Sequence, residues 1–217
     1  MIPLTTRPRE RTPQSEPDPD RRGTILGLSL TGFREVAYVD WGPADAGVPV
    51  LCVHGLSRQG RDFDYLAAEL AGMRRRVVCP DLVGRGRSGR LRSPNEYALP
   101  QYCADMNALV ARLGAEETDL VGTSLGGLIG MVLAGMPRNS IRRLVINDIG
   151  PFLPWKGLAR IGTYLSAMPA LSGSGRGRSL FPGVSGSFWR AGGRAMDADY
   201  APQCSVGCEQ GTLLHAL

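Results

Sequence analysis

One serine of this chain stands in a sequence context that is typical of an activated nucleophile. Residues 122–126 read Gly-Thr-Ser-Leu-Gly and follow directly on residues 119–121, which have the character of a short strand. This spacing predicts a sharp turn from a strand into a helix, because glycines leave room where the backbone doubles back. The turn would expose the Ser124 hydroxyl and aim the N–H of Leu125 at the place where negative charge develops on a bound carbonyl.

Three other strand-like runs also end in a polar motif. His54-Gly55 follows one run, Asp81 follows the next, and Asp148 follows the run after Ser124. The carboxyl ends of parallel strands meet at one edge of a sheet, where open α/β sheets bind their ligands. These four positions are therefore expected along one rim, and this arrangement is far more specific than the serine motif alone.

Hydrophobic periodicity predicts the elements that position this rim. Continuous apolar runs indicate buried strands, and apolar residues three and four positions apart indicate helices. Asp62 is expected to cap the first helix, and Gly114 to end the second. Strands that alternate with helices over short connections predict a doubly wound, mostly parallel α/β sheet, entered through an antiparallel hairpin. The expected strands are residues 25–30, 34–41, 48–53, 76–79, 119–121 and 141–147, and the expected helices are residues 62–71, 99–113 and 124–134.

Composition limits the function classes. The 217 residues, 43% of them hydrophobic, suit one medium-sized domain, and no apolar run is long enough to span a membrane. The net charge of +5 comes from basic residues spread along the chain without a basic and aromatic stripe, so no nucleic-acid partner is expected. The five cysteines are irregularly spaced, and Cys204 and Cys208 lack a second ligand pair, which argues against zinc. We expect a reducing, cytoplasmic setting, because no secretory signal is found; the oligomeric state stays open.

The strand-end motifs together resemble the α/β-hydrolase superfamily. The resemblance covers about residues 24–168 and rests on His-Gly-Leu at 54–56, Asp-Leu-Val-Gly-Arg-Gly-Arg-Ser at 81–88 and Gly-Thr-Ser-Leu-Gly-Gly at 122–127. The stretch Leu-Val-Ile-Asn-Asp-Ile-Gly-Pro at 144–151 is also similar to the branch that holds small-molecule esterases, carbon–carbon bond hydrolases and lipase-like enzymes. The resemblance implies a sheet of the α/β-hydrolase type.

The resemblance also implies a reaction and the residues that perform it. Ser124 would be the nucleophile, and the backbone N–H groups of Leu56 and Leu125 would form the oxyanion hole. The substrate would be a small ester or a related carbonyl compound, and neither a metal nor an organic cofactor would be needed. His54 would orient its loop rather than accept a proton, and the glycines of the Asp81 motif would shape a second loop along the rim.

The residues that would activate Ser124 are harder to identify. A serine hydroxyl needs a histidine to accept its proton and an acid to orient that histidine. The resemblance implies the chain order serine, acid, histidine. Asp148 and His215 are the candidates, but His215 stands at the extreme end of the chain with no strand before it to fix the imidazole. Asp197 and Asp199 are weaker candidates for the acid.

Hydrophobic periodicity is missing at both ends of the chain. Residues 1–23 are rich in Pro, Arg, Asp and Glu, which predicts a disordered tail. Residues 157–168 have the spacing of an opening cap helix. Residues 169–217 are dominated by Gly, Ser, Arg and Ala, and they contain neither a fifth buried parallel strand nor further cap helices.

This loss of pattern favours one hypothesis and leaves another open. From about residue 169 the sequence has the composition of an out-of-frame translation of a GC-rich gene, so the C-terminal part of the fold would be missing or out of frame. The chain would then be a truncated, catalytically inactive hydrolase remnant, whose fourth parallel strand has an exposed edge that promotes aggregation. The alternative is a working serine hydrolase that uses Asp148 and His215. Translation of the same DNA in the other two frames tests the first hypothesis.

Overall fold

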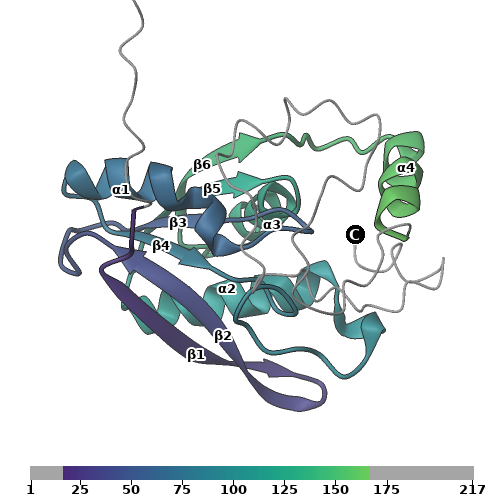
Figure 1. Cartoon of the computed structure of the whole chain (residues 1–217), viewed down its shortest axis with the longest axis horizontal. Helices are drawn as coiled ribbons and strands as arrows, with labels where there is room; N and C mark the ends of the chain where they lie inside the picture. Colours follow the sequence, from purple (N-terminus) through teal and green to yellow (C-terminus); the bar gives the residue numbers. More distant parts are fainter. Residues whose placement is uncertain (1–16, 167–217) are drawn as a thin grey trace, which may run out of the picture.

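A mixed sheet of six strands forms the centre of the molecule (Figure 1). The structure is a computed structural model that describes residues 17–166 of the 217-residue chain. The strand order is β1-β2-β4-β3-β5-β6, with β1 and β2 antiparallel to their neighbours and the other four strands parallel. The predicted doubly wound, mostly parallel sheet with an antiparallel entry hairpin is therefore confirmed. The strands are β1 (Arg21–Ser29), β2 (Gly32–Trp41), β3 (Val50–Val53), β4 (Val77–Pro80), β5 (Thr118–Thr123) and β6 (Ile141–Asn147).

Helices cover both faces of this sheet. The short 3-10 helix η1 (Gly60–Phe63) and α1 (Asp64–Gly72) pack on one face, and α2 (Leu99–Leu113) and α3 (Leu125–Ala134) pack on the other. A second 3-10 turn, η2 (Pro94–Glu96), precedes α2. The helix α4 (Trp155–Ser166) follows β6 and lies beyond the end of the sheet (Figure 1).

The strand β3 shows why the chain must cover both faces. Successive side chains of a strand point to opposite sides. Leu51 and Val53 belong to the apolar cluster under α2 and α3, whereas Val50 and Cys52 belong to the cluster under α1. All four side chains are buried. A continuous apolar run at the centre of a parallel sheet therefore requires helices on either side, as the sequence predicted.

Two boundaries differ from the sequence prediction for identifiable reasons. β1 begins at Arg21, inside the segment expected to be a disordered tail, because the Arg21 guanidinium bonds the Asp40 carboxylate at 3.0 and 3.2 Å across the strand pair. The first helix starts two residues later than predicted, at Asp64, and Phe63 is its N-cap residue. Asp62 does not cap that helix, because its carboxylate accepts a hydrogen bond from Arg58 instead.

The second predicted helix and its end agree with the structure. α2 has Pro100 in its first turn, and it ends at Gly114, which adopts a left-handed conformation at φ 67°. The predicted opening cap helix corresponds to α4. The rest of the predicted tail, residues 1–16, and the predicted low-complexity segment, residues 169–217, lie outside the described residues. Each helix between residues 17 and 166 is too short or not apolar enough to cross a membrane.

Candidate active site

The four polar motifs lie at one edge of the sheet, as predicted. His54 follows β3, Asp81 follows β4, Ser124 follows β5 and Asp148 follows β6. Because these four strands are parallel, all four residues emerge at the same rim. The rim therefore gathers side chains that are far apart in the sequence.

Ser124 occupies a strained turn between β5 and α3. Its backbone has φ 52° and ψ −114°, a conformation that residues with a side chain rarely adopt. The turn is held from two sides, because the Ser124 N–H donates to the Asn147 carbonyl at 2.9 Å and the Ser124 carbonyl accepts from the Leu128 N–H at 3.1 Å. Ser124 itself is half-buried at the rim.

The flanking glycines are required by close backbone contacts. A Cβ atom placed on Gly122 would lie 2.4 Å from the Gly126 carbonyl oxygen, and one placed on Gly126 would lie 2.0 Å from the Val53 carbonyl oxygen. Both distances are shorter than any real contact between such atoms. The Gly-x-Ser-x-Gly pattern is therefore the steric condition for packing this turn against the end of β3.

Two backbone donors lie close to Ser124. A Cβ atom built on Gly55 would lie 3.5 Å from the Ser124 Cβ, so the loop after β3, which continues into Leu56, packs against the serine. Leu125 is the first residue of α3, where helical N–H groups lack an intrahelical acceptor. Among residues 17–166, neither the Leu56 N–H nor the Leu125 N–H has a hydrogen-bond acceptor.

His54 links two of the rim loops and is not available as a base. Its ring is buried, its Nε2 accepts a hydrogen bond from the Leu82 N–H at 2.9 Å, and its Nδ1 bonds the Gly55 carbonyl at 2.7 Å. A carbonyl can only accept, so Nδ1 carries the proton and donates it. Burial, helped by the charges of Arg85 and Arg58, lowers the pKa of His54 to about 3. The neutral imidazole therefore fixes the loops after β3 and β4, in agreement with the role expected from the resemblance.

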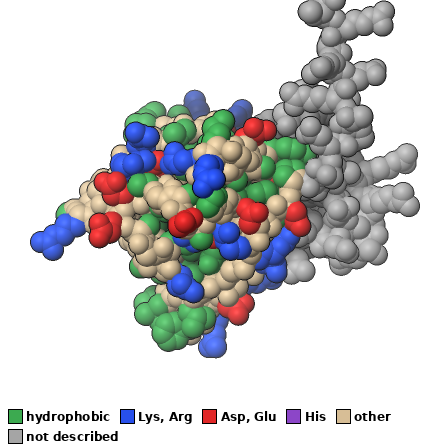
Figure 2. Space-filling view, turned by 90° about the vertical axis from the view of Figure 1, so that its left-hand side faces the viewer, with side chains coloured by type: hydrophobic (Ala, Val, Ile, Leu, Met, Phe, Trp, Pro, Cys, Tyr) green, Lys and Arg blue, Asp and Glu red, His purple; other side chains and the backbone are tan. Residues whose placement is uncertain are grey.

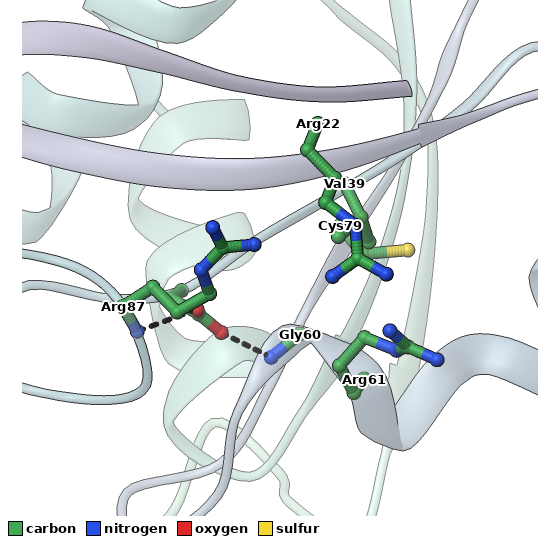
Figure 3. A pocket seen from close by; sticks show the side chains of 7 residues that line it. Arg22, Val39, Gly60, Arg61, Cys79 and Arg87 are labelled. Atoms are coloured by element: carbon green, nitrogen blue, oxygen red, sulfur yellow. Dashed lines mark hydrogen bonds between the residues drawn. The ribbon is translucent and has the colours of Figure 1, made fainter. Parts of the chain in front are cut away.

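Asp81 shapes the loop after β4. Its carboxylate accepts the Gly60 N–H at 2.7 Å and the Arg87 N–H at 2.9 Å, and Figure 3 draws both bonds. The Ser88 hydroxyl donates to the Asp81 carbonyl at 2.6 Å and accepts the Ala37 N–H at 2.8 Å. Burial raises the pKa of Asp81, while the two backbone bonds oppose that shift. The motif therefore acts as a loop scaffold, as the sequence predicted.

A cavity of about 380 Å³ opens beside Asp81, away from the serine turn (Figure 3). Arg22, Arg61 and Arg87 line it, whereas Ser124, Leu56 and Leu125 do not. Among residues 17–166, no group of three or more His, Cys, Asp or Glu side chains is arranged to hold a metal ion.

The surface in Figure 2 mixes both signs of charge. Basic and acidic side chains are interspersed on this face, and hydrophobic side chains gather at its lower end, where the β1–β2 hairpin lies. Leu28, Leu30 and Phe33 of that hairpin are 61%, 95% and 73% exposed.

The residues proposed as acid and base are not brought together within the described part of the chain. Asp148 is exposed at φ 56°, and it forms no hydrogen bond or ion pair with any residue in 17–166. His215, Asp197 and Asp199 lie outside the described residues. A triad built on Asp148 and His215 therefore stays a prediction.

Sequence reasoning missed Arg85, which contacts the oxyanion loop directly. Its Nε donates to the Leu56 carbonyl at 2.9 Å, and its Nη1 donates to the Val83 carbonyl and to the Tyr102 hydroxyl, both at 2.8 Å. No local pattern could have indicated these contacts, because the partners Leu56 and Tyr102 lie 29 and 17 residues away.

The family model for the alpha/beta hydrolase fold matches residues 48–195, which is more than half of the chain. The match continues beyond residue 168, where the sequence resemblance was expected to end. The 3-hydroxybutyrate-oligomer hydrolase of Cupriavidus necator is 46% identical over 171 residues, which is 78% of this chain and 58% of that protein.

Two solved structures are also similar. An alpha/beta hydrolase from Novosphingobium aromaticivorans is 38% identical with a TM-score of 0.60, and it covers 67% of this chain and 50% of its own. A hydrolase from Rickettsia typhi is 32% identical with a TM-score of 0.62, and it covers 67% of this chain and 54% of its own. The chain thus spans little more than half the length of these relatives.

Proposed function

The chain belongs to the alpha/beta hydrolase family, and from this premise we propose that it is a serine hydrolase of small esters with Ser124 as its nucleophile. The observation that supports the proposal most is the strained turn, which holds Ser124 at φ 52° with the loop after β3 packed against it. Strained backbone of this kind persists where it aims a reactive group. The family gives the coarser class, a hydrolase that acts on a small molecule.

The proposed reaction has two symmetrical halves. The Ser124 Oγ forms a bond to the ester carbonyl carbon, and the electron pair of the C=O bond moves to the oxygen. The Leu56 and Leu125 N–H groups donate to that oxyanion, which makes the tetrahedral state more stable than it would be in water. The oxyanion then collapses, the C–O bond to the alcohol breaks, and the proton of Ser124 leaves with the alcohol. Water repeats the attack and releases the acid.

The base in this proposal is His215, oriented by Asp148. His54 is unsuitable, because both of its ring nitrogens are occupied and burial lowers its pKa to about 3. The chain has only two histidines, so His215 is the one other imidazole that could accept the Ser124 proton.

The first substrates to test are short oligomers of 3-hydroxybutyrate. The relative that is 46% identical is named for hydrolysis of this compound class, and oligomers of a hydroxy acid are small molecules joined by ester bonds. The proposed chemistry needs no metal and no organic cofactor, because backbone donors stabilise the charge.

The second candidate is a hydrolase remnant without turnover. One observation favours it: in the described residues, the only histidine is engaged at both ring nitrogens and cannot activate Ser124. Without a base, a serine hydroxyl at neutral pH is a poor nucleophile.

Labelling with a fluorophosphonate probe separates the two candidates. The full chain, Ser124→Ala and Ser57→Ala are treated with the probe, and the modified residue is identified by peptide mass spectrometry. Ser57→Ala is the matched control, because Ser57 is an exposed serine next to Leu56 in the same loop. The serine hydrolase proposal expects stoichiometric labelling of the wild type and Ser57→Ala, none of Ser124→Ala, and hydrolysis of a nitrophenyl ester and a 3-hydroxybutyrate dimer.

Absence of labelling together with absence of ester turnover supports the remnant. Labelling that persists in Ser124→Ala contradicts the assignment of Ser124. The variants His215→Ala and Asp148→Ala then test the proposed base and acid in the same assay.

A further inference from the structure

Arg85 is the one side chain that ties the oxyanion loop to the rest of the rim from outside that loop and its own strand, within residues 17–166. It is half-buried in the loop after β4, and it donates hydrogen bonds to the carbonyls of Leu56 and Val83 and to the Tyr102 hydroxyl of α2. Its guanidinium also lies over the rings of Tyr97 and Tyr102, at 5.7 and 5.3 Å from their centroids. Contacts on both its edges and its faces leave the group a single orientation.

These contacts determine where the Leu56 N–H points. The Gly55 carbonyl is bonded by the His54 ring at 2.7 Å and by the Arg58 N–H at 3.2 Å. In a trans peptide the carbonyl and the following N–H point in opposite directions, so these bonds set the direction of the Leu56 N–H. Arg85 fixes the next peptide through the Leu56 carbonyl at 2.9 Å. Leu56 is therefore held at both of its peptide planes.

The charge of Arg85 is not compensated by a carboxylate within the described residues. Other half-buried or buried arginines pair with acids, as Arg34 does with Asp105 at 2.5 Å and Arg75 does with Asp119 at 2.9 Å. The partners of Arg85 in residues 17–166 are two carbonyls, a hydroxyl and two aromatic rings. A guanidinium stays protonated at any working pH. Its positive charge therefore remains beside the loop that would face a developing oxyanion.

We propose that Arg85 is a positioning residue for the oxyanion hole, which fixes the Leu56 N–H and places an uncompensated positive charge behind it. This inference rests on the proposed function of Ser124 and adds a second requirement to it. Arg85 touches neither Ser124 nor the carbonyl under attack. It acts through Leu56, so its removal should slow the step in which negative charge develops and leave the binding of a neutral reagent unchanged.

The variants Arg85→Met, Arg85→Lys and Arg87→Met test this proposal in the full chain. Arg87 offers the matched control, because it is an exposed arginine two residues further along the same loop. We measure the rate of Ser124 modification by the fluorophosphonate probe over a range of probe concentrations, and the fraction of protein that is finally modified. The fraction reports misfolding, and the limiting rate reports the stabilisation of charge.

We expect Arg85→Met to lower the limiting rate on the order of 10-fold to 100-fold, less than the roughly 10²- to 10³-fold cost of deleting a direct oxyanion donor. The half-saturating probe concentration and the modified fraction should not change. Arg85→Lys keeps the charge but cannot reach all three acceptors, so it should recover part of the rate. Arg87→Met should behave as the wild type. A wild-type limiting rate in Arg85→Met overturns the proposal, and so does a loss confined to the modified fraction.

Hydrogen–deuterium exchange of the peptide that covers residues 54–61 gives a readout that needs no activity. Faster exchange of this peptide in Arg85→Met than in Arg87→Met supports the positioning role, and equal exchange overturns it. If the wild type is not labelled at all, the proposed function of Ser124 fails, and the exchange result alone decides whether Arg85 positions Leu56.

Discussion

The two halves of the rim are fixed to very different degrees. Around Ser124, buried polar bonds lock the loops together, since His54 joins the loops after β3 and β4 and Asp81 holds two backbone N–H groups. Next to this region, β6 forms the edge of the sheet in the described part of the chain, and its Val145 and Ile146 side chains are 55% and 39% exposed. Asp148, at the end of β6, makes no polar contact within the described residues.

This difference separates the two requirements of a hydrolase. A nucleophile and its oxyanion donors must be held in place before the substrate binds, because catalysis depends on sub-ångström placement. The loops after β3, β4 and β5 have that kind of support. The acid and base need equally firm support, and the β6 side shows no comparable polar network among residues 17–166. Substitutions on the two sides should therefore differ in cost.

The largest effect is expected from Gly126→Ala. The new methyl group would lie 2.0 Å from the Val53 carbonyl oxygen, so β3 and α3 would have to move apart. We expect the free energy of unfolding to fall by about 3 kcal/mol or more in urea denaturation. Gly135→Ala, at the other end of the same helix, is the control, because its methyl group would meet its nearest atoms at 3.4 and 3.6 Å. Equal losses in the two variants would contradict the close packing of the elbow.

The next effect is a loss of stability at acid pH that comes from His54. The pKa of this imidazole is about 3 in the folded protein and 6.5 in an unfolded chain, so its contribution is complete above pH 6.5 and is lost as the pH falls toward 3. The expected slope is about 1.4 kcal/mol per pH unit in that window. Urea denaturation at about pH 7 and about pH 5 should show a loss of about 2 kcal/mol in the wild type.

The variant His54→Gln isolates this contribution. Glutamine retains a donor and an acceptor but does not titrate, so it should flatten the pH dependence. His215→Gln replaces the other histidine of the chain and should keep the wild-type slope. A slope that is unchanged by His54→Gln would mean that His54 is not the buried neutral group.

A smaller effect is expected where β6 joins the sheet. Asp119 of β5 accepts hydrogen bonds from Arg142 of β6 at 2.7 and 2.9 Å and from Arg75 at 2.9 Å, and the bonds to Arg142, more than those to Arg75, lower the pKa of Asp119. Asp119→Asn should lower the free energy of unfolding by about 1 kcal/mol. The exposed Asp45 supplies the control variant Asp45→Asn, which should match the wild type; a loss as large as that of Gly126→Ala would erase the contrast between the two sides.

The smallest effect on stability is expected at the exposed edge. Val145→Lys should change the free energy of unfolding by less than about 0.5 kcal/mol, because the side chain is largely in solvent. The added charge should reduce self-association, since a lysine on an edge strand hinders pairing with another chain. Light scattering measures the association, and Val145→Thr keeps the β-branched shape without the charge. Unchanged scattering in Val145→Lys would show that association does not involve this edge.

The features that depend on local sterics and periodicity could be predicted from the sequence. Gly122 and Gly126 are required by contacts within the turn, and β3 follows from an uninterrupted apolar run. Features that depend on distant partners could not be predicted. Arg21 enters β1 because of Asp40, which is 19 residues away, and Arg85 reaches Leu56 across 29 residues. A single polar residue in a sequence does not reveal its partner, so the support of the site emerges only from the folded chain.

The neutral imidazole of His54 also gives the protein a built-in spectroscopic reporter. Its Nδ1 proton lies in a buried bond of 2.7 Å, and water can replace it only when the loops after β3 and β4 separate. Such a proton resonates well downfield of the backbone amides in an NMR spectrum. Its exchange broadening would therefore time the opening of the rim in solution, before any substrate is identified.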